Sequence, residues 1–462
     1  MISTCECVAL GHPDRTADAI TSYILDAYLR KDPKTRYAVE CQIKDNYVTL
    51  AGEVTSKANF MREDIAALVR SAIRKIGYTS EYAWKWPKGA TLDADKVVVQ
   101  QFIGQQSPNI AQGVDRGGWG DQGVFCGMAV NDEKHGYMPL DRYYSHAICD
   151  ALYNAARNGI IPIGLDIKTQ VTTDENFVCE VIVAAPMQER DRILAESKIR
   201  KVISGIIPLG CGPDKVIING TGSYVIHSSV GDAGTTGRKL AVDFYGLNCP
   251  IGGGAPWSKD GTKADVALNL LARYEAIRYI KKYPKMKQCI VKISCCIGRD
   301  DVWMTYFDEH GDVWDSKHIN ISQSDVIKLF DLRQPVFFGM CRDGLFSIVD
   351  RKAVEDKNLQ PKTHTKKRNN QMKQVGFKPV ASKKDAQKNL TAALVLCKEC
   401  KKQFVSITKL NTCFGLKSKG GEMAAKAVEA LRIKPVLKGT ARYLTKDDAR
   451  KVIDFVYGHK AK

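Results

Sequence analysis

Apolar residues recur every three or four positions in several stretches of the chain, which is the spacing of one face of an α-helix. In residues 16–28, the side chains of Ala17, Ile20, Ile24 and Tyr28 share such a face. The same spacing predicts further helices over residues 62–78, 139–159, 189–207 and 262–283. The chain is therefore expected to contain several amphipathic helices of ordinary length.

Shorter stretches rich in Val, Ile, Thr and aromatic residues separate these helices and predict β-strands. Hairpins are expected over residues 36–54 and 168–186, and single strands over 96–104, 238–246 and 288–298. A hairpin, a helix and a strand follow one another about three times along residues 1–355. We therefore predict an α/β (α+β) fold with three pseudo-repeated layers of mixed or largely antiparallel sheet and helices, followed by a small C-terminal extension.

Positive charge is concentrated at the C-terminal end of the chain. The net charge is +18 over 462 residues, and residues 356–462 carry 26 Lys and Arg against 8 Asp and Glu. The first part of this tail is basic and poor in aliphatic residues, which is typical of a linker that does not fold alone. We expect three core repeats, a basic linker and a small basic module, with the boundaries 1–105, 106–226, 227–355, 356–390 and 391–462.

Cysteine and hydropathy patterns exclude several classes of protein. The 15 cysteines, an odd number scattered along the chain, do not resemble a secreted disulfide framework. No apolar run approaches the roughly 18–20 residues of a membrane span. The N-terminal residues have no basic region before their apolar stretch, as a secretory signal would. We expect reduced thiols and a cytoplasmic protein without a membrane partner.

The sequence GHPDR, at residues 11–15, stands directly before the first predicted helix. Pro13 suits the first helical turn, because its missing N–H removes no hydrogen bond there. His12 and Asp14 would then lie at a helix N-terminus, where free N–H groups attract anions. An ordinary helix cap is the alternative interpretation, since aspartate is common in a first turn.

Other polar, glycine-rich stretches lie between the predicted elements, at residues 105–123, 166–170, 231–239 and 252–265. Such loops let backbone N–H groups approach phosphates, and nearby Lys or Arg supplies compensating charge. The third stretch is not a P-loop, because five residues separate Gly231 from Gly237 and Arg238 follows.

Cations and acids alternate in the last of these stretches. Lys259 and Lys263, four residues apart near the start of a predicted helix, share one face. With Asp260 and Asp265 they suit a polyphosphate and its divalent metal. A solvated charged surface is the alternative.

Together these stretches resemble the motifs of the methionine adenosyltransferases, also called S-adenosylmethionine synthetases. The matching segments, in order, are GHPDR, an acidic strand with Glu40, AGEVTSKA (51–58), QSPNIAQGV (106–114), GDQG (120–123), DIKTQV (166–171), GDAGTTGRK (231–239) and GGGAPWSKDGTKAD (252–265). The resemblance covers roughly residues 5–300. It implies that ATP, L-methionine and water give S-adenosylmethionine, phosphate and diphosphate. The methionine sulfur would attack C5′ of ATP, and the departing triphosphate would then be hydrolysed.

The resemblance also implies roles for individual residues. Those implied in catalysis are His12, Arg15, Lys168, Arg238, Lys239, Lys259 and Lys263. Those implied to bind ATP are His12, Asp166, Lys168, Ser223, Tyr224, Asp232, Arg238, Lys239, Ala255 and Lys259. Those implied to bind methionine are Glu53, Gln106, Asp232 and Lys263. Asp14 and Asp265 would hold Mg²⁺ and Glu40 would hold K⁺, while Asp121 lies in the matched GDQG. A homodimer or homotetramer is implied, because the family's sites form between two subunits.

Some positions depart from the family pattern. Arg15 replaces a lysine, and a planar fork is not a point charge. Ser223 and Tyr224 replace an arginine and a phenylalanine beside the adenine. The loop that closes over the site is reduced to residues 116–119. We therefore expect a less gated enzyme, in which deletion of residues 117–119 changes turnover little.

The tail contains part of a zinc-finger pattern. Cys397, Cys400 and Cys413 match three ligand positions, and Phe404 and Leu410 match the two apolar core positions. The fourth ligand is missing from the pattern. Either a distant His or Cys completes the zinc site, or the segment has lost its metal. The positive charge favours RNA or DNA as a partner, with a solubilising extension as the alternative.

Two functions follow from these observations. The first is a methionine adenosyltransferase with an appended basic module. The second is a non-catalytic homologue that binds ATP or S-adenosylmethionine and acts as a nucleic-acid-binding sensor or adaptor. Retention of nearly all charged site positions favours the enzyme, because a decayed site should have lost some of them.

Overall fold

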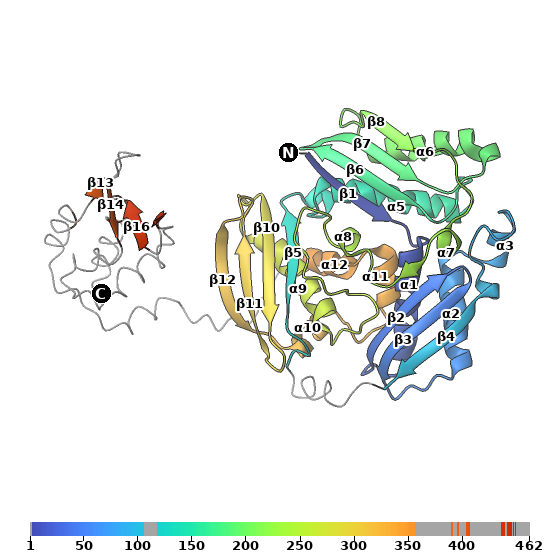
Figure 1. The fold of residues 1–462 in the computed structure, drawn as a ribbon, viewed down its shortest axis with the longest axis horizontal. Coiled ribbons are helices and arrows are strands. Elements are labelled where there is room, and N and C mark those ends of the chain that lie inside the picture. Colours follow the sequence, from blue (N-terminus) through green and yellow to red (C-terminus); the bar gives the residue numbers. More distant parts are fainter. Residues whose placement is uncertain are drawn as a thin grey trace. The chain divides into compact units, whose positions relative to one another are not determined.

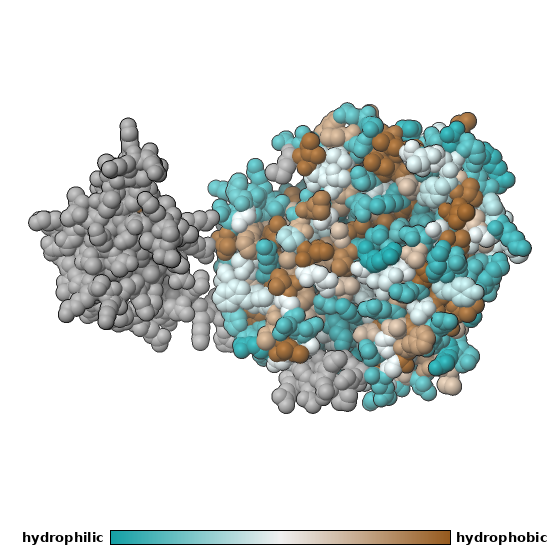
Figure 2. All heavy atoms as spheres, in the orientation of Figure 1, coloured by the Kyte–Doolittle hydropathy of each residue, from teal (hydrophilic) through white to brown (hydrophobic). Residues whose placement is uncertain are grey.

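The computed structural model describes residues 2–105 and 118–355, and in the tail the four strands given below with Leu390, Asp447 and Ala449. The chain divides into two compact units, Met1–Thr365 and Lys366–Lys462. Figure 1 shows three sheets in the first unit, with α1, α9, α11 and α12 in the middle of them. Figure 2 shows polar and apolar side chains interspersed over the visible face of this unit.

One sheet has the strand order β4-β3-β2-β9. β2 (Arg36–Lys44) and β3 (Tyr47–Thr55) form the expected hairpin. Its turn holds Asp45 at a φ of 52°, in the left-handed region. β4 (Val98–Gly104) runs parallel to β3, and the short β9 (Gly234–Thr235) pairs with β2.

The other two sheets of this unit have the orders β1-β6-β7-β8 and β12-β11-β10-β5. The first contains β1 (Ile2–Val8), β6 (Lys168–Asp174), β7 (Phe177–Ala184) and β8 (Lys215–Ile218), and only its β7–β8 pair is parallel. The second contains β5 (Gly123–Val130), β10 (Gln288–Cys295), β11 (Asp301–Phe307) and β12 (Val313–Asn320), all antiparallel. The prediction of a mixed α/β fold with largely antiparallel sheets is confirmed.

Each of these sheets combines strands from two distant stretches of the chain. β1 pairs with β6, β5 pairs with β10, and β9 pairs with β2. These pairings bring loops that are far apart in the sequence to the same place. Gly234 illustrates this, because a Cβ on it would lie only 2.1 Å from the carbonyl oxygen of Pro13.

The long helices agree with the apolar spacing. They are α1 (Pro13–Lys31), α2 (Arg62–Ile76), α5 (Leu140–Arg157), α6 (Arg192–Ile206) and α9 (Ala264–Lys282). Shorter helices are α3 (Ser80–Ala83), α7 (Ser228–Gly231), α8 (Leu240–Asp243), α10 (Gln323–Leu329), α11 (Phe337–Asp343) and α12 (Ser347–Glu355). Single 3₁₀ turns occur at Ala94–Lys96, Glu133–His135 and Glu189–Asp191. None of the described helices combines the length and hydropathy that a membrane span requires.

Residues 238–246 are not the strand that was expected. They form α8 and the turn after it, although Leu240, Val242 and Phe244 alternate with other residues as in a strand. The alternation is misleading because Asp243, which should face solvent in such a strand, is buried. A short apolar run of this kind does not distinguish a buried helical turn from a strand.

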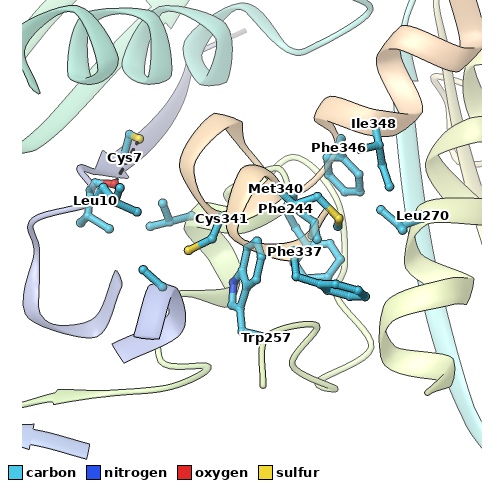
Figure 3. Close-up of a cluster of buried hydrophobic side chains, with 14 of the residues drawn as sticks. Cys7, Leu10, Phe244, Trp257, Leu270, Phe337, Met340, Cys341, Phe346 and Ile348 are labelled. Atoms are coloured by element: carbon cyan, nitrogen blue, oxygen red, sulfur yellow. Dashed lines mark hydrogen bonds between the residues drawn. The ribbon is translucent and has the colours of Figure 1, made fainter. Parts of the chain in front are cut away.

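Aromatic and sulfur-containing side chains fill the space between α8, α9, α11 and α12 (Figure 3). Phe244, Trp257 and Phe337 are each at most 2% exposed. Phe346, directly before α12, stacks on Tyr245 with ring centroids 5.1 Å apart. This packing anchors the segment that follows Arg238 and Lys239.

The second unit contains a four-stranded antiparallel sheet. Its strands are β13 (Val395–Leu396), β14 (Gln403–Ser406), β15 (Val436–Lys438) and β16 (Ala441–Thr445), in the order β13-β14-β16-β15. Phe404 lies in β14. Cys397, Cys400 and Cys413 lie outside the described residues, so the zinc prediction is untested.

Candidate active site

The N-terminus of α1 places His12 and Asp14 where the sequence predicts. His12 is the N-cap, and its Nδ1 accepts a hydrogen bond of 3.2 Å from the N–H of Asp14. Burial, reinforced by the nearby Lys239 cation, lowers the pKa of His12 to about 4. The imidazole is therefore neutral at pH 7 and acts as a hydrogen-bonding group rather than a cation.

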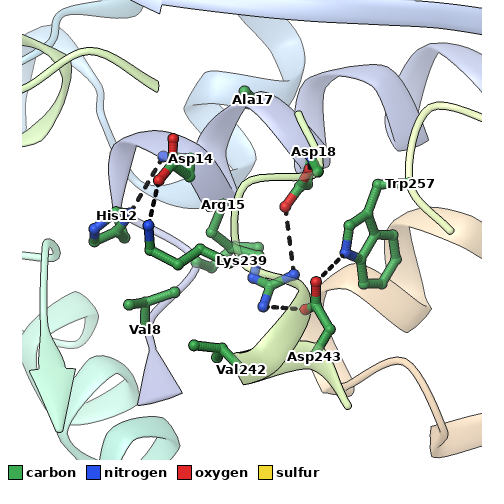
Figure 4. Close-up of polar contacts among 12 residues, drawn as sticks. Val8, His12, Asp14, Arg15, Ala17, Asp18, Lys239, Val242, Asp243 and Trp257 are labelled. Atoms are coloured by element: carbon green, nitrogen blue, oxygen red, sulfur yellow. Dashed lines mark hydrogen bonds and ion pairs between the residues drawn. The ribbon is translucent and has the colours of Figure 1, made fainter. Parts of the chain in front are cut away.

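Asp14 is fully buried at the centre of a charged cluster (Figure 4). Its Oδ1 accepts hydrogen bonds from Arg238 Nε at 2.8 Å and from the Thr235 N–H at 2.9 Å. Its Oδ2 accepts one from Lys239 Nζ at 2.6 Å. Burial alone would raise the pKa of Asp14, but the bonds from Lys239 and Thr235 outweigh it and the pKa lies below its usual range. Asp14 is therefore ionised, and two cations stand beside it.

Arg15 lies one residue further along α1 and points away from this cluster into the interior (Figure 4). It forms ion pairs with Asp243 and with Asp18, the latter at 3.5 Å, and lies 5.4 Å from the Trp257 ring. Neither acid was among the predicted site residues. The only sequence signal was that Asp18 follows Arg15 by three residues and Asp14 by four.

A second group lies beside this cluster, between β6 and α7. Lys168 pairs with Glu6 at 2.6 Å. The carboxylate of Asp166 accepts the Ser228 N–H at 2.9 Å, and burial raises the pKa of Asp166 to about 7. The hydroxyl of Tyr224 donates to the Asp166 carbonyl at 3.2 Å. Ser223 instead donates to Glu189 at the surface.

The 252–265 loop reaches the first cluster at one end and α9 at the other. A Cβ on Gly237 would lie 2.8 Å from the Cβ of Ala255, so these two loops are in close contact. Further along, Lys259 pairs with Asp265 at 2.6 Å. Lys263 is the N-cap residue of α9, two residues before Asp265. The loop therefore adds a second cation–carboxylate pair.

These two cation–carboxylate groups lie along the same edge of β2. Thr235 pairs with Gln42 of β2, and Lys259 forms a bridge with Ala38. Four residues of extended strand separate the two contacts, which corresponds to ~13 Å. That separation is on the scale of an extended polyphosphate with its nucleoside.

Glu40 and Glu53 lie on the face of this sheet that is turned away from α1. Tyr37, Val39 and Cys41 alternate with Glu40 and form the buried face. Glu53 of β3 is the strand partner of Ala38 of β2, and its side chain is exposed. The two acids are thus not joined to the cation cluster within one chain.

Of the remaining predicted residues, Asp232 is exposed and accepts the N–H of Ala233 at 2.8 Å. Asp121 is exposed as well, and its carbonyl accepts the Cys295 thiol at 3.3 Å. Gln106 lies outside the described residues. Their arrangement around a substrate stays a prediction.

Trp119 changes the expectation for the shortened loop. It is fully buried, its backbone N–H donates to the Arg299 carbonyl at 2.8 Å, and its backbone carbonyl accepts the Gly298 N–H at 2.8 Å. A Cβ on Gly118 would lie 2.4 Å from the Gly298 backbone. Deletion of residues 117–119 would remove a core side chain, so we no longer expect it to be harmless.

No group of three or more His, Cys, Asp or Glu side chains that could cage a metal occurs among the described residues. Asp14 and Asp265 instead stand as separate carboxylates, each with a cation bound. Mg²⁺ is commonly held by one or two carboxylates together with substrate phosphates. The arrangement therefore fits a metal ion that arrives with a polyphosphate.

The fold and this site define a mixed α/β protein with cations held by carboxylates beside a helix N-terminus. Family models for S-adenosylmethionine synthetase match the chain over residues 1–108 (N-terminal domain), 116–224 (central domain) and 226–352 (C-terminal domain). The chain therefore belongs to the S-adenosylmethionine synthetase family, and its activity is that of a methionine adenosyltransferase.

Individual relatives agree with the family models. The S-adenosylmethionine synthase of Maricaulis maris (strain MCS10) is 36% identical over 324 residues, covering 67% of this chain and 81% of that protein. The one from Desulforudis audaxviator (strain MP104C) is 34% identical over 378 residues, covering 74% and 92%. The solved structure of an unusual S-adenosylmethionine synthetase from Campylobacter jejuni is 32% identical with a TM-score of 0.67, covering 75% of this chain and 94% of that one.

Proposed function

We propose that the cluster of Asp14, Arg238 and Lys239 at the N-terminus of α1 binds the triphosphate of ATP during adenosyl transfer to methionine. The buried carboxylate with two cations beside it carries the proposal, because it holds these cations in place before substrate arrives. The positive end of α1 adds to their field. Lys168, Lys259 and Lys263 would complete the cationic surroundings.

The reaction needs no protein nucleophile. The sulfur of methionine forms a bond to C5′, and the C5′–O5′ bond breaks with its electron pair passing to the triphosphate. Charge therefore builds on the departing oxygen, where prearranged cations stabilise the transition state most. His12 is neutral and lies at the N-terminus of α1, where its Nδ1 accepts the Asp14 N–H. Its Nε2–H would therefore donate a hydrogen bond to that oxygen. Water then attacks the triphosphate and gives phosphate and diphosphate.

Mg²⁺ would be held by Asp14 and Asp265, and K⁺ by Glu40. When bound, these ions neutralise charge on the phosphates and on the acidic face of the site. Binding would require Asp14 to exchange Arg238 and Lys239 for the metal, which releases both side chains to the phosphate oxygens. Asp265 would exchange Lys259 in the same way.

The adenine would rest against Tyr224, whose hydroxyl is fixed by the Asp166 carbonyl, with Ser223 and Ala255 nearby. Methionine would be held by Glu53, Gln106, Asp232 and Lys263. Glu53 is exposed on the sheet face opposite α1, so we propose that it serves the site of a second subunit in a homodimer or homotetramer. We further propose a cytoplasmic location.

Incubation of the protein with ATP, methionine, Mg²⁺ and K⁺ tests the function directly. We expect S-adenosylmethionine to form, and we expect Lys239→Met to reduce turnover about 100-fold, the magnitude typical of a group that stabilises developing charge. Lys215→Met is the matched control, because the Lys215 side chain is 65% exposed and pairs with the partly exposed Glu180 of the neighbouring strand. Absence of product from the wild-type protein, with ATP still bound, would contradict the proposal.

For the tail, we propose an anionic partner such as RNA or DNA, because residues 356–462 carry the positive excess of the chain. Binding of RNA and DNA by the full chain and by residues 1–365 should be compared across a salt series. We expect affinity to fall steeply with salt and to depend on the tail. Equal binding by both proteins would instead favour the interpretation of the tail as a solubilising extension.

Zinc in the tail is tested by metal analysis of the full chain and of its Cys400→Ser variant.

A further inference from the structure

The segment from Gly234 to Asp243 is attached to the first two turns of α1 at several points. The N–H of Thr235 binds Asp14, and the N–H of Gly237 donates to Asp18 Oδ1 at 2.9 Å. At its far end, Asp243 pairs with Arg15. Arg238 and Lys239 lie between these attachments, so their backbone is held on both sides.

The attachments divide between two sides of α1 (Figure 4). On one side, Asp14 holds Arg238 and Lys239, which are 48% and 20% exposed. Arg15 and Asp18 face the interior, where they meet Asp243. Exposure falls from 6% for Arg15 to 2% for Asp243 and 0% for Asp18, so water screens none of these charges.

Arginine suits this interior position better than lysine. One nitrogen of its fork reaches Asp18 at 3.5 Å while the other reaches Asp243, and the plane of the group packs near Trp257. The indole of Trp257 also donates to Asp243 at 2.7 Å, which fixes the orientation of that carboxylate. A lysine offers a single ammonium and cannot span both acids in this way.

The contacts of these cations support an ordered arrangement. Arg15 lies beside the carboxyl groups of Asp18 and Asp243, and Arg238 and Lys239 lie beside that of Asp14. Burial raises the pKa of both Asp18 and Asp243, and the Arg15 cation opposes that rise. Loss of Arg15 would remove the guanidinium that pairs with both Asp18 and Asp243, which favours rearrangement of the segment.

We propose that Arg15, Asp18 and Asp243 are positioning residues that hold the backbone of residues 235–243 and thereby place Arg238 and Lys239 at the triphosphate. The proposal rests on the function proposed above for those two cations. It assigns to Arg15 a role through other residues, in place of the direct catalytic role that the sequence suggests.

Inorganic tripolyphosphate with Mg²⁺ is the probe, because its binding needs neither methionine nor turnover. Arg15→Lys and Asp18→Asn should each bind it about tenfold more weakly than the wild type, since one charge-assisted contact to the phosphates is misplaced. The kcat for S-adenosylmethionine should fall about 10- to 100-fold, as expected for displaced catalytic groups. The KM for methionine should stay within about twofold, because the displaced cations serve the triphosphate.

Arg273→Lys is the matched control. Arg273 is fully buried on α9, donates to backbone carbonyls and pairs with Asp350 at 3.1 Å, away from the charged cluster. We expect this variant to lower the melting temperature and to keep the wild-type affinity for tripolyphosphate.

Two outcomes separate the inference from the proposed function. If Arg15→Lys and Asp18→Asn fold, lower the melting temperature as Arg273→Lys does and keep tripolyphosphate affinity, the three residues only stabilise the fold and the inference is wrong. If the wild type binds tripolyphosphate but forms no product, while Arg15→Lys binds it more weakly, the inference stands and the proposed function fails. Should Asp18→Asn not fold, the milder Arg15→Lys decides.

Discussion

His227 makes the free energy of unfolding depend on pH, because its side chain is buried and neutral. Its side chain is 1% exposed and packs against Trp86, with ring centroids 4.4 Å apart. The Nδ1–H donates to the Val225 carbonyl at 2.7 Å, which leaves Nε2 to accept the Tyr82 hydroxyl at 2.8 Å. Protonation would add a buried charge and remove that acceptor. Burial accordingly lowers the pKa of His227 to about 4.

The sign follows from the two pKa values. An unfolded histidine titrates near 6.5, so between pH 6.5 and 4 the unfolded chain binds a proton that the folded chain refuses. The free energy of unfolding therefore falls as pH falls through this window. The full contribution is about 3 kcal/mol, of which about 2 kcal/mol is lost between pH 7 and pH 5.

Denaturant unfolding at pH 7 and pH 5, followed by tryptophan fluorescence, measures this loss. We expect His227→Phe to be less stable than the wild type at pH 7, because two hydrogen bonds are lost, but to lose about 2 kcal/mol less on acidification. His310→Gln, at an exposed position, should behave as the wild type does. If His227→Phe and the wild type lose equal stability between the two pH values, the reasoning from burial is refuted.

Since the Ser228 N–H, directly after His227, donates to Asp166, acid should also weaken ATP binding before the core unfolds.

Two glycines give further tests of the site geometry. A Cβ at Gly254 would lie 1.8 Å from Asp265 Oδ1. Gly254→Ala should therefore displace that carboxylate and raise the Mg²⁺ concentration for half-maximal activity about tenfold. Gly205→Ala is the control, because a Cβ there meets nothing within 4 Å, and it should leave the Mg²⁺ requirement unchanged. An unchanged Mg²⁺ requirement would argue against a metal at Asp265. A Cβ at Gly234 would meet the rigid backbone of Pro13, so Gly234→Ala should reduce kcat about 100-fold by separating the cations from α1, and near-normal kcat would contradict that picture.

Much of the fold follows from the sequence because its long helices and hairpins repeat apolar residues at clear periods. The spacing from Ala17 to Tyr28 predicts α1, and the polar turn at Asp45 predicts the β2–β3 hairpin. The strand expected over 238–246 was wrong because period-two alternation in a short run is ambiguous when consecutive residues, here Val242 to Tyr245, are all buried. β11 and β12 were not predicted, and β12 is mostly exposed or half-buried, which weakens its apolar pattern.

The site was predictable only where residues lie in recognisable motifs. His12 and Asp14 could be placed at a helix N-terminus from local spacing alone. The pairing of Asp14 with Lys239 joins residues 225 positions apart, and no local period encodes such a contact. Arg15 directly follows Asp14 in the sequence, but neighbouring helical residues point about 100° apart and do not share a face. The motif that places Asp14 in the site therefore does not place Arg15 there. Its partner Asp243 lay in the segment whose secondary structure was wrong.

The exchange of strands among the three sheets has a consequence for synthesis of the protein on the ribosome. β1 at the N-terminus finds its partner only when β6, beginning at Lys168, has emerged, and β2 receives β9 only after Thr235. β5 pairs with β10 only after Gln288 to Cys295 have been translated. Contacts of such long sequence separation form slowly, and no third of the core can complete its own sheet. The nascent chain therefore exposes unpaired strand edges until most of it has been translated, a stage at which chaperone binding would be most useful.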